Sequence, residues 1–100
     1  MEIQSTAQAN GTRCVVRGEA DADNCGELGT ALLGIAIDGP IELDLSGLTF
    51  LDSSAVSELL RVHGALEADG VEMRIVDPSP AVHRVLEITG LLDLFGIPAG

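Results

Sequence analysis

Residues 41–66 constrain the fold more than any other stretch, because they show a strand, a short connection and a helix in direct succession. Apolar side chains at Ile41, Leu43 and Leu45 alternate with the acidic side chains of Glu42 and Asp44. This period of two is typical of a β-strand with one buried face. The chain is therefore expected to contain a sheet with at least one interior strand.

The connection that follows leads into a helix. The strand is predicted to end at Ser46 and Gly47, and residues 48–51 are predicted to form an apolar loop. Asp52, Ser53 and Ser54 come next, and these residue types favour the first position of a helix. Two serines thus lie at a helix amino terminus, where backbone N–H groups and the helix dipole favour added negative charge. The predicted inner face of this helix is an apolar stripe of Val56, Leu59, Leu60, His63 and Leu66.

The rest of the chain adds strands and helices around this unit and predicts one α/β domain over residues 1–100. Asn10 and Gly11 are a strong signal for a hairpin. A leading hairpin followed by strand–helix units implies a small mixed β-sheet partly covered by helices, with a small flavodoxin-like domain as the alternative. The predicted elements are strands at residues 2–8, 13–17 and 71–76, a helix from Asp21 or Asp23 to about Ile37, a helix at residues 80–89 and a short final turn.

An excess of negative charge limits the partners of the chain. It has 16 acidic residues, five arginines and no lysine, which gives a net charge of −11. Nucleic acid and anionic membrane surfaces would repel such a chain, whereas a basic protein surface would attract it. The lack of lysine also excludes a P-loop and Schiff-base chemistry.

Cysteine usage indicates a reducing compartment, and the hydropathy of the chain indicates that it does not span a membrane. Cys14 and Cys25 are too few for a zinc site and are expected to be free thiols, and we predict no metal and no cofactor. No stretch approaches the roughly 18 apolar residues of a membrane span, and the first residues lack the basic and apolar regions of a signal peptide. We therefore expect a cytoplasmic protein without membrane insertion.

Three segments of the chain resemble the STAS domain of bacterial anti-sigma-factor antagonists. Residues 43–55, LDLSGLTFLDSSA, are similar to the family's pattern D-L-S/E-x-L-x-F/Y-x-D-S-S-G between a strand and a helix. Residues 18–21, GEAD, are similar to its G-E-x-D, and residues 79–91, SPAVHRVLEITGL, to its S-P-x-V-x-R-x-L-x-x-x-G-L. Together these segments span nearly the whole chain in the family's order, with Ala55 in place of the family's final glycine in the first pattern.

The resemblance implies a STAS fold and a function as a protein-interaction switch. An antagonist of this family binds an anti-sigma factor that is also a serine kinase, and so releases a sigma factor. The resemblance places the phosphorylated serine at Ser53 and implies a serine phosphatase that reverses the modification. On the residues alone, a plain helix cap is the alternative role for Ser53.

The same resemblance places partner-binding residues around this serine. Asp52 and Ser54 flank it, and either could serve only as a helix cap. Leu48 and Phe50 precede it; one should pack inward and the other could be an exposed apolar contact for the partner, although core packing of both is the commoner outcome for such a pair. The remaining members are Asp21 and Asp23, for which a solvated acidic turn is the alternative.

Two other functions compete with this interpretation. One is a STAS subunit that docks on a transporter ATPase and is never phosphorylated. The departure from the antagonist pattern at Ala55 is consistent with this alternative. The other is a small hydrolase or nucleotide-binding enzyme. The sequence has no glycine-rich phosphate loop, metal cluster or G-x-S-x-G turn, and His63 would lie roughly 15 Å along the helix from Ser53. We therefore predict a protein that is not an enzyme.

Overall fold

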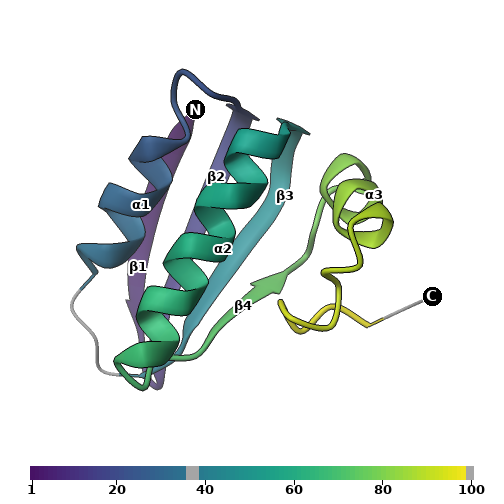
Figure 1. Ribbon diagram of the computed structural model, residues 1–100. Coiled ribbons are helices and arrows are strands. Elements are labelled where there is room, and N and C mark those ends of the chain that lie inside the picture. The colour runs from purple at the N-terminus through teal and green to yellow at the C-terminus, as the bar shows by residue number, and fades with distance from the viewer. Residues whose placement is uncertain (36–38, 99–100) are drawn as a thin grey trace.

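The computed structural model, which describes residues 1–35 and 39–98, has four strands and three helices in these ranges (Figure 1). The first two strands form an antiparallel hairpin, and the later pairs in the sheet are parallel. The predicted α/β fold with a mixed sheet is therefore confirmed. In chain order the elements are β1 (Glu2–Gln8), β2 (Gly11–Ala20), α1 (Gly26–Leu33), β3 (Ile41–Leu51), α2 (Ser53–Ala68), β4 (Met73–Val76) and α3 (Pro80–Ile88).

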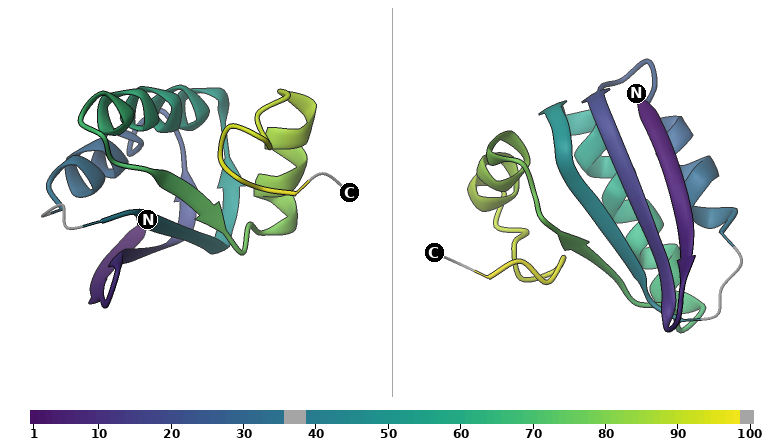
Figure 2. Two further views of the ribbon diagram at one scale, coloured as in Figure 1. Left: turned by 90° about the horizontal axis from the view of Figure 1, so that it is seen from below. Right: turned by 180° about the vertical axis from the view of Figure 1, so that it is seen from behind.

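The sheet has the order β1-β2-β3-β4, and its two faces differ. Helices α1 and α2 cover one face, while none of the helices in the described ranges lies on the opposite face (Figures 1 and 2). Ile41, Leu43 and Leu45 point to the covered face and are each at most 1% exposed. This arrangement explains the alternating pattern in β3, because burial of apolar side chains favours folding and the intervening acidic residues can stay on the other face.

Strand β3 runs further than the sequence predicts. Its predicted end at Ser46 and Gly47, and the predicted loop at residues 48–51, are both wrong, because β2 also continues to Ala20 and pairs with this segment. The pairing between β2 and β3 shifts register at two places along this extended ladder. Beside the second shift, the Thr49 hydroxyl donates a hydrogen bond to the carbonyl of Gly18 at 3.0 Å. Such bulges leave no clear signal in sequence periodicity.

The ends of three other elements also differ from expectation. Helix α1 begins at Gly26 and is capped at its carboxyl end by Gly34, whereas the predicted end at Ile37 lies outside the described residues. Strand β4 begins at Met73, two residues later than predicted. Helix α3 ends at Ile88 with Thr89 as its C-cap, one residue short of the predicted end.

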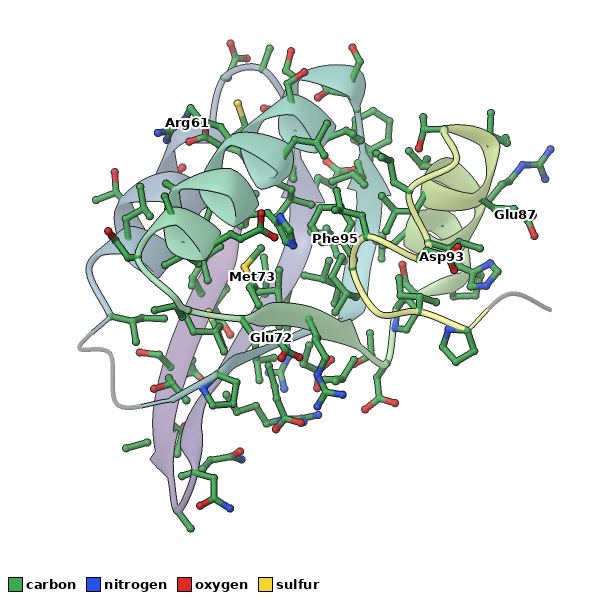
Figure 3. All side chains as sticks on the ribbon, turned by 60° about the horizontal axis from the view of Figure 1, so that its bottom comes forward. Arg61, Glu72, Met73, Glu87, Asp93 and Phe95 are labelled. Atoms are coloured by element: carbon green, nitrogen blue, oxygen red, sulfur yellow. The ribbon has the colours of Figure 1, made fainter. Side chains whose placement is uncertain are left out.

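The segment after α3 completes the core. Phe95 is fully buried and points into the interior of the molecule (Figure 3). Its ring meets the ring of His63 edge-on, with 5.4 Å between the centroids. The Phe95 carbonyl accepts a hydrogen bond from the N–H of Ile75 at 2.9 Å, which covers the outer edge of β4. Within the predicted stripe of α2, Leu60 is instead 37% exposed, and Val62 is buried in its place.

An ion-pair cluster lies on the open face of the sheet. The guanidinium of Arg13 on β2 is 2.8 Å from the carboxylate of Asp44 on β3 and 3.3 Å from that of Asp77, which follows β4. Burial pushes the pKa of Asp44 upward, but hydrogen bonds from Ser46 and Arg13 outweigh it and leave that pKa below its ordinary value. The cluster therefore ties three adjacent chain segments together and keeps Asp44 ionised.

Candidate functional site

Ser53 is the first residue of α2 and is exposed. The preceding residue, Asp52, has extended backbone angles and is the N-cap, with its carboxylate accepting a hydrogen bond from the N–H of Ala55 at 3.0 Å. The aspartate side chain thus satisfies one of the N–H groups that a helix start leaves without a partner. The Ser53 hydroxyl is not needed for this cap and stays accessible.

The second oxygen of the Asp52 carboxylate connects the helix to another segment. It accepts a hydrogen bond from the N–H of Ala22 at 3.1 Å, in the loop between β2 and α1. The backbone N–H of Asp52 also donates to the carbonyl of Ala20 at 3.2 Å. These bonds hold the β2–α1 loop, which contains Asp21 and Asp23, beside the start of α2. The two aspartates lie near the serine, as the sequence predicted.

The β2–α1 loop has its own internal hydrogen bonds. The Asp21 carboxylate accepts from the N–H groups of Asp23 and Asn24 at 3.0 and 3.2 Å, so this half-buried side chain mainly shapes the turn. The side-chain oxygen of Asn24 accepts a hydrogen bond from the N–H of Asp21, and its side-chain nitrogen donates to the carbonyl of Glu19. Sequence reasoning missed Asn24, although asparagine side chains commonly hydrogen-bond to nearby backbone in turns. Asp23 is exposed and is the aspartate of the pair that is available to a partner.

Leu48 and Phe50 alternate across β3. Leu48 is fully buried, whereas Phe50 is 46% exposed, so one packs inward and the other faces solvent, instead of both lying in the core. The inclusion of Leu48 among partner-binding side chains is therefore wrong, because the continuing strand turns this side chain into the core. The carbonyl of Leu48 accepts a hydrogen bond from the buried hydroxyl of Ser79, which also caps α3 by accepting from the N–H of Val82. Ser79 thus holds β3 against α3 just ahead of the site.

Ser54 and Ala55 complete the first turn of α2. Ser54 is half-buried, and Ala55 is fully buried with its methyl group turned to the core. Ala55 has a position inside a regular helix and donates its N–H to Asp52. Alanine is well suited to such a position, and its methyl group does not cover Ser53.

This end of the molecule carries negative charge without compensating arginines. Four of the five arginines form ion pairs elsewhere in the described part of the chain, three of them from the sheet and Arg61 with Glu58 on α2. Within the described ranges, none of the acidic residues of this surface forms an ion pair; these are Glu19, Asp21, Asp23, Glu27 and Asp52. The surface favours a basic partner.

The structure offers no catalytic arrangement at Ser53 among the described residues. His63 lies ten residues further along α2, and its ring packs against Phe95. Residues 1–35 and 39–98 contain no group of three or more side chains placed to hold a metal ion. Over the same ranges, no helix has the length and apolar character needed to cross a membrane.

Comparison with known proteins connects this architecture to a family. The sequence model described as "Mlab, STAS domain" matches residues 3–96. The anti-sigma F factor antagonist of Paenibacillus polymyxa is 37% identical over 57 residues, which are 57% of this chain and 49% of that protein, so the match spans about half of that relative's length. The anti-sigma-B factor antagonist of Staphylococcus aureus is 29% identical over 100% of this chain and 94% of its own.

Solved structures show the same fold. SpoIIAA, an anti-sigma factor antagonist and Bacillus cell fate determinant, is 23% identical to this chain. Its unphosphorylated form superposes with a TM-score of 0.73 over 98% of this chain and 89% of that one. Its phosphorylated form superposes with a TM-score of 0.66 over 98% and 92%.

Proposed function

This chain belongs to the STAS-domain family, and from that premise we propose that it is an anti-sigma-factor antagonist. It binds an anti-sigma factor and thereby allows a sigma factor to leave that partner. The names of its relatives in Paenibacillus polymyxa and Staphylococcus aureus support this function. In this proposal the protein acts in the cytoplasm as a binding switch without catalytic activity.

We further propose that phosphorylation of Ser53 controls the switch. The observation that carries this proposal is the exposed Ser53 hydroxyl at the start of α2, capped by Asp52 rather than by the serine itself. A partner kinase transfers a phosphoryl group to this oxygen, which adds about −1.5 to −2 charge. A serine phosphatase then restores the free hydroxyl.

Electrostatics explains how the phosphate would release the partner. The surface around Ser53 already carries unpaired carboxylates, and Asp23 and Phe50 are exposed beside it. A basic partner docks there by charge attraction, with Phe50 as an apolar contact. Docking would bury the phosphate together with the neighbouring Asp52 carboxylate. The loss of hydration and the stronger repulsion between these two anions in the dry interface then outweigh the added attraction to a basic partner, so the complex weakens.

A second candidate function is docking on a transporter ATPase without phosphorylation. Ala55, in place of the glycine of the antagonist pattern, is the observation that favours it. However, the Ala55 methyl group is buried and does not cover Ser53, so this replacement does not by itself prevent phosphorylation of Ser53. The description of the matching sequence model, "Mlab, STAS domain", does not name an antagonist, so both functions need a direct test.

A kinase assay with radiolabelled ATP and the cognate anti-sigma factor tests the antagonist proposal. Wild type and Ser54→Ala should be labelled, and Ser53→Ala should not. Ser57→Ala is the matched control, because Ser57 is another exposed serine on α2. Ser53→Asp carries less charge than a phosphate and should weaken binding without abolishing it.

Two results would overturn the proposal. Labelling of Ser53→Ala at the wild-type level would show that another residue is modified. Failure of the anti-sigma factor to bind or label wild type, together with binding to a transporter ATPase, would favour the docking function. Urea unfolding of each variant provides the folding control, with a loss of about 1 kcal/mol or less expected for Ser53→Ala because Asp52 is the cap.

A further inference from the structure

The two edge strands of the sheet, β1 and β4, differ in whether other residues of the chain bond to their outer side. The outer edge of β4 is covered, since the N–H of Ile75 donates to the carbonyl of Phe95. Strand β1 forms the other edge and pairs only with β2 in the described ranges, over the seven residues Glu2–Gln8. Among the described residues, this sheet edge therefore has no pairing strand (Figure 2).

The direction of the backbone groups on β1 follows from one hydrogen bond made by the neighbouring strand β2. The N–H of Thr12 donates to the carbonyl of Pro40 at 3.0 Å, so the backbone of Thr12 faces β3. Because backbone groups alternate in direction along a strand, the odd-numbered residues of β2 face β1. They lie opposite the even-numbered residues of β1 in the ladder. The N–H and C=O groups that point away from β2 therefore belong to Ile3, Ser5 and Ala7.

Beyond its first residue, this edge lacks the features that usually prevent strand addition. Strand β1 has one charged residue, Glu2, and residues 3–8, IQSTAQ, contain neither a charged residue nor a proline. The ladder between β1 and β2 has no register shift, so the strand is not bulged away from an incoming chain. Natural sheets commonly protect an open edge with charged side chains, a proline or a bulge.

A groove lies beside the edge, on the helix-covered side of the sheet. Helix α1 lies beside and above β1 and extends past it (Figures 1 and 2). The walls of the groove come from both elements and are mostly small or apolar, as in Ile3, Ala7, Gly26, Ala31 and Gly34. At the end near Ile3, the lining also includes the carboxylates of Asp23 and Glu27.

We propose that the β1 edge binds an extended segment of a partner protein as an added antiparallel strand. Its backbone pairs with Ile3, Ser5 and Ala7, and its alternate side chains, small and apolar, enter the groove beneath α1. A basic residue at its carboxyl-terminal end faces Asp23 and Glu27, because an antiparallel strand ends beside Ile3. This site adjoins the acidic surface around Ser53 through Asp23 and Glu27, but the backbone pairing along β1 does not involve Ser53 and does not depend on the proposed switch.

The overhang of α1 favours a single strand over a second copy of this chain. Two copies joined edge to edge through β1 would carry both α1 helices on the same side of the combined sheet. Each helix would then enter the space above the edge that the other already occupies (Figure 1). An isolated extended segment has no such helix and fits below α1.

Amide hydrogen exchange followed by NMR tests the proposal with a defined probe. The probe is the peptide acetyl-Val-Thr-Val-Thr-Val-Thr-Arg-amide, whose valines face the groove in the antiparallel arrangement. Its addition should slow exchange at Ile3, Ser5 and Ala7, with little change at Gln4 and Thr6, whose amides already bond to β2. Absence of this alternation at saturating peptide would overturn the proposal.

Matched variants separate backbone pairing from other contacts. Ser5→Pro removes one outward N–H and should weaken peptide binding about tenfold or more, whereas Ser5→Ala retains the N–H and should bind normally. A peptide ending in glutamate should bind more weakly than the arginine peptide at low salt, and Asp23→Asn with Glu27→Gln should remove that difference. Protection of Ile3, Ser5 and Ala7 that rises with protein concentration in the absence of peptide would instead identify a second copy as the occupant.

Discussion

At the scale of single residues, Asp52 links two chain segments at the site with its two carboxylate oxygens. One carboxylate oxygen caps α2 through Ala55, and the other holds the β2–α1 loop through Ala22. Asp52→Ala should lower the free energy of unfolding by about 1–2 kcal/mol. Asp52→Ser should recover the cap, but its shorter side chain cannot span to Ala22.

Amide exchange distinguishes the two bonds of Asp52. In Asp52→Ser, exchange at Ala22 should accelerate while exchange at Ala55 stays slow, and in Asp52→Ala both should accelerate. Equal exchange at Ala22 in wild type and Asp52→Ser would show that the loop is held by other contacts. Urea melts of the three proteins give the stability changes.

The residues of the site were only partly predictable. The helix start at Ser53 could be predicted, because three capping residue types precede an apolar stripe. Asp52 was expected as a cap, but its bond to Ala22 could not be, since that bond depends on how β2 ends. The inward turn of Leu48 was missed as a consequence of missing the second half of β3. The serine and proline at residues 79 and 80 are a local signal for the start of α3, whereas the bond from Ser79 to the carbonyl of Leu48 arises from tertiary packing.

At the scale of elements, the Arg13 cluster joins β2, β3 and the segment after β4, and its contribution should depend on pH. The pKa of Asp44 is lower in the folded protein than its ordinary value near 3.9. The stabilisation is therefore present above about pH 4 and is lost as the pH falls through the folded pKa. Asp44→Asn should cost about 1–3 kcal/mol at pH 7, and this difference from wild type should shrink below about pH 4.

Urea melts from pH 7 to pH 3 measure this difference. Glu2→Gln is the control, because Glu2 forms an exposed ion pair with Arg17 whose expected value is about 0–1 kcal/mol. A difference between wild type and Asp44→Asn that stays constant over this range would show that the cluster stabilises the sheet by packing rather than by charge.

Element types were more predictable than element ends. The hydrophobic period of β3 and the caps of α2 and α3 are local signals, and all three elements lie where the sequence placed their starts. The extension of β2 to Ala20 depends on the parallel ladder with β3, which is a contact between distant residues. The exposure of Leu60 and the burial of Val62 follow from how α2 lies against α1 and the segment around Phe95.

At the scale of the whole molecule, the net charge of −11 should reduce stability by self-repulsion. Moderate sodium chloride shortens the range of this repulsion and should raise the melting temperature. A gain of about 1 kcal/mol corresponds to a shift of roughly 4–8 °C for a domain of this size. Differential scanning calorimetry at increasing salt, with glucose at equal osmolality as the control, measures the effect, and a fall in melting temperature would show that the ion pairs dominate.

The buried position of Phe95 also affects how the protein forms during its synthesis. The largest fully buried side chain lies late in the sequence, and Ile97 is buried after it. A ribosome adding about 5–20 residues per second needs several seconds to extend the chain from Leu51 to Ile97. During that interval the nascent protein has its central strands but not the residues that close the core. The apolar side chains of these strands therefore stay without their final packing partners until synthesis is nearly complete. We expect a chaperone that binds exposed apolar segments to contact the nascent chain during this interval.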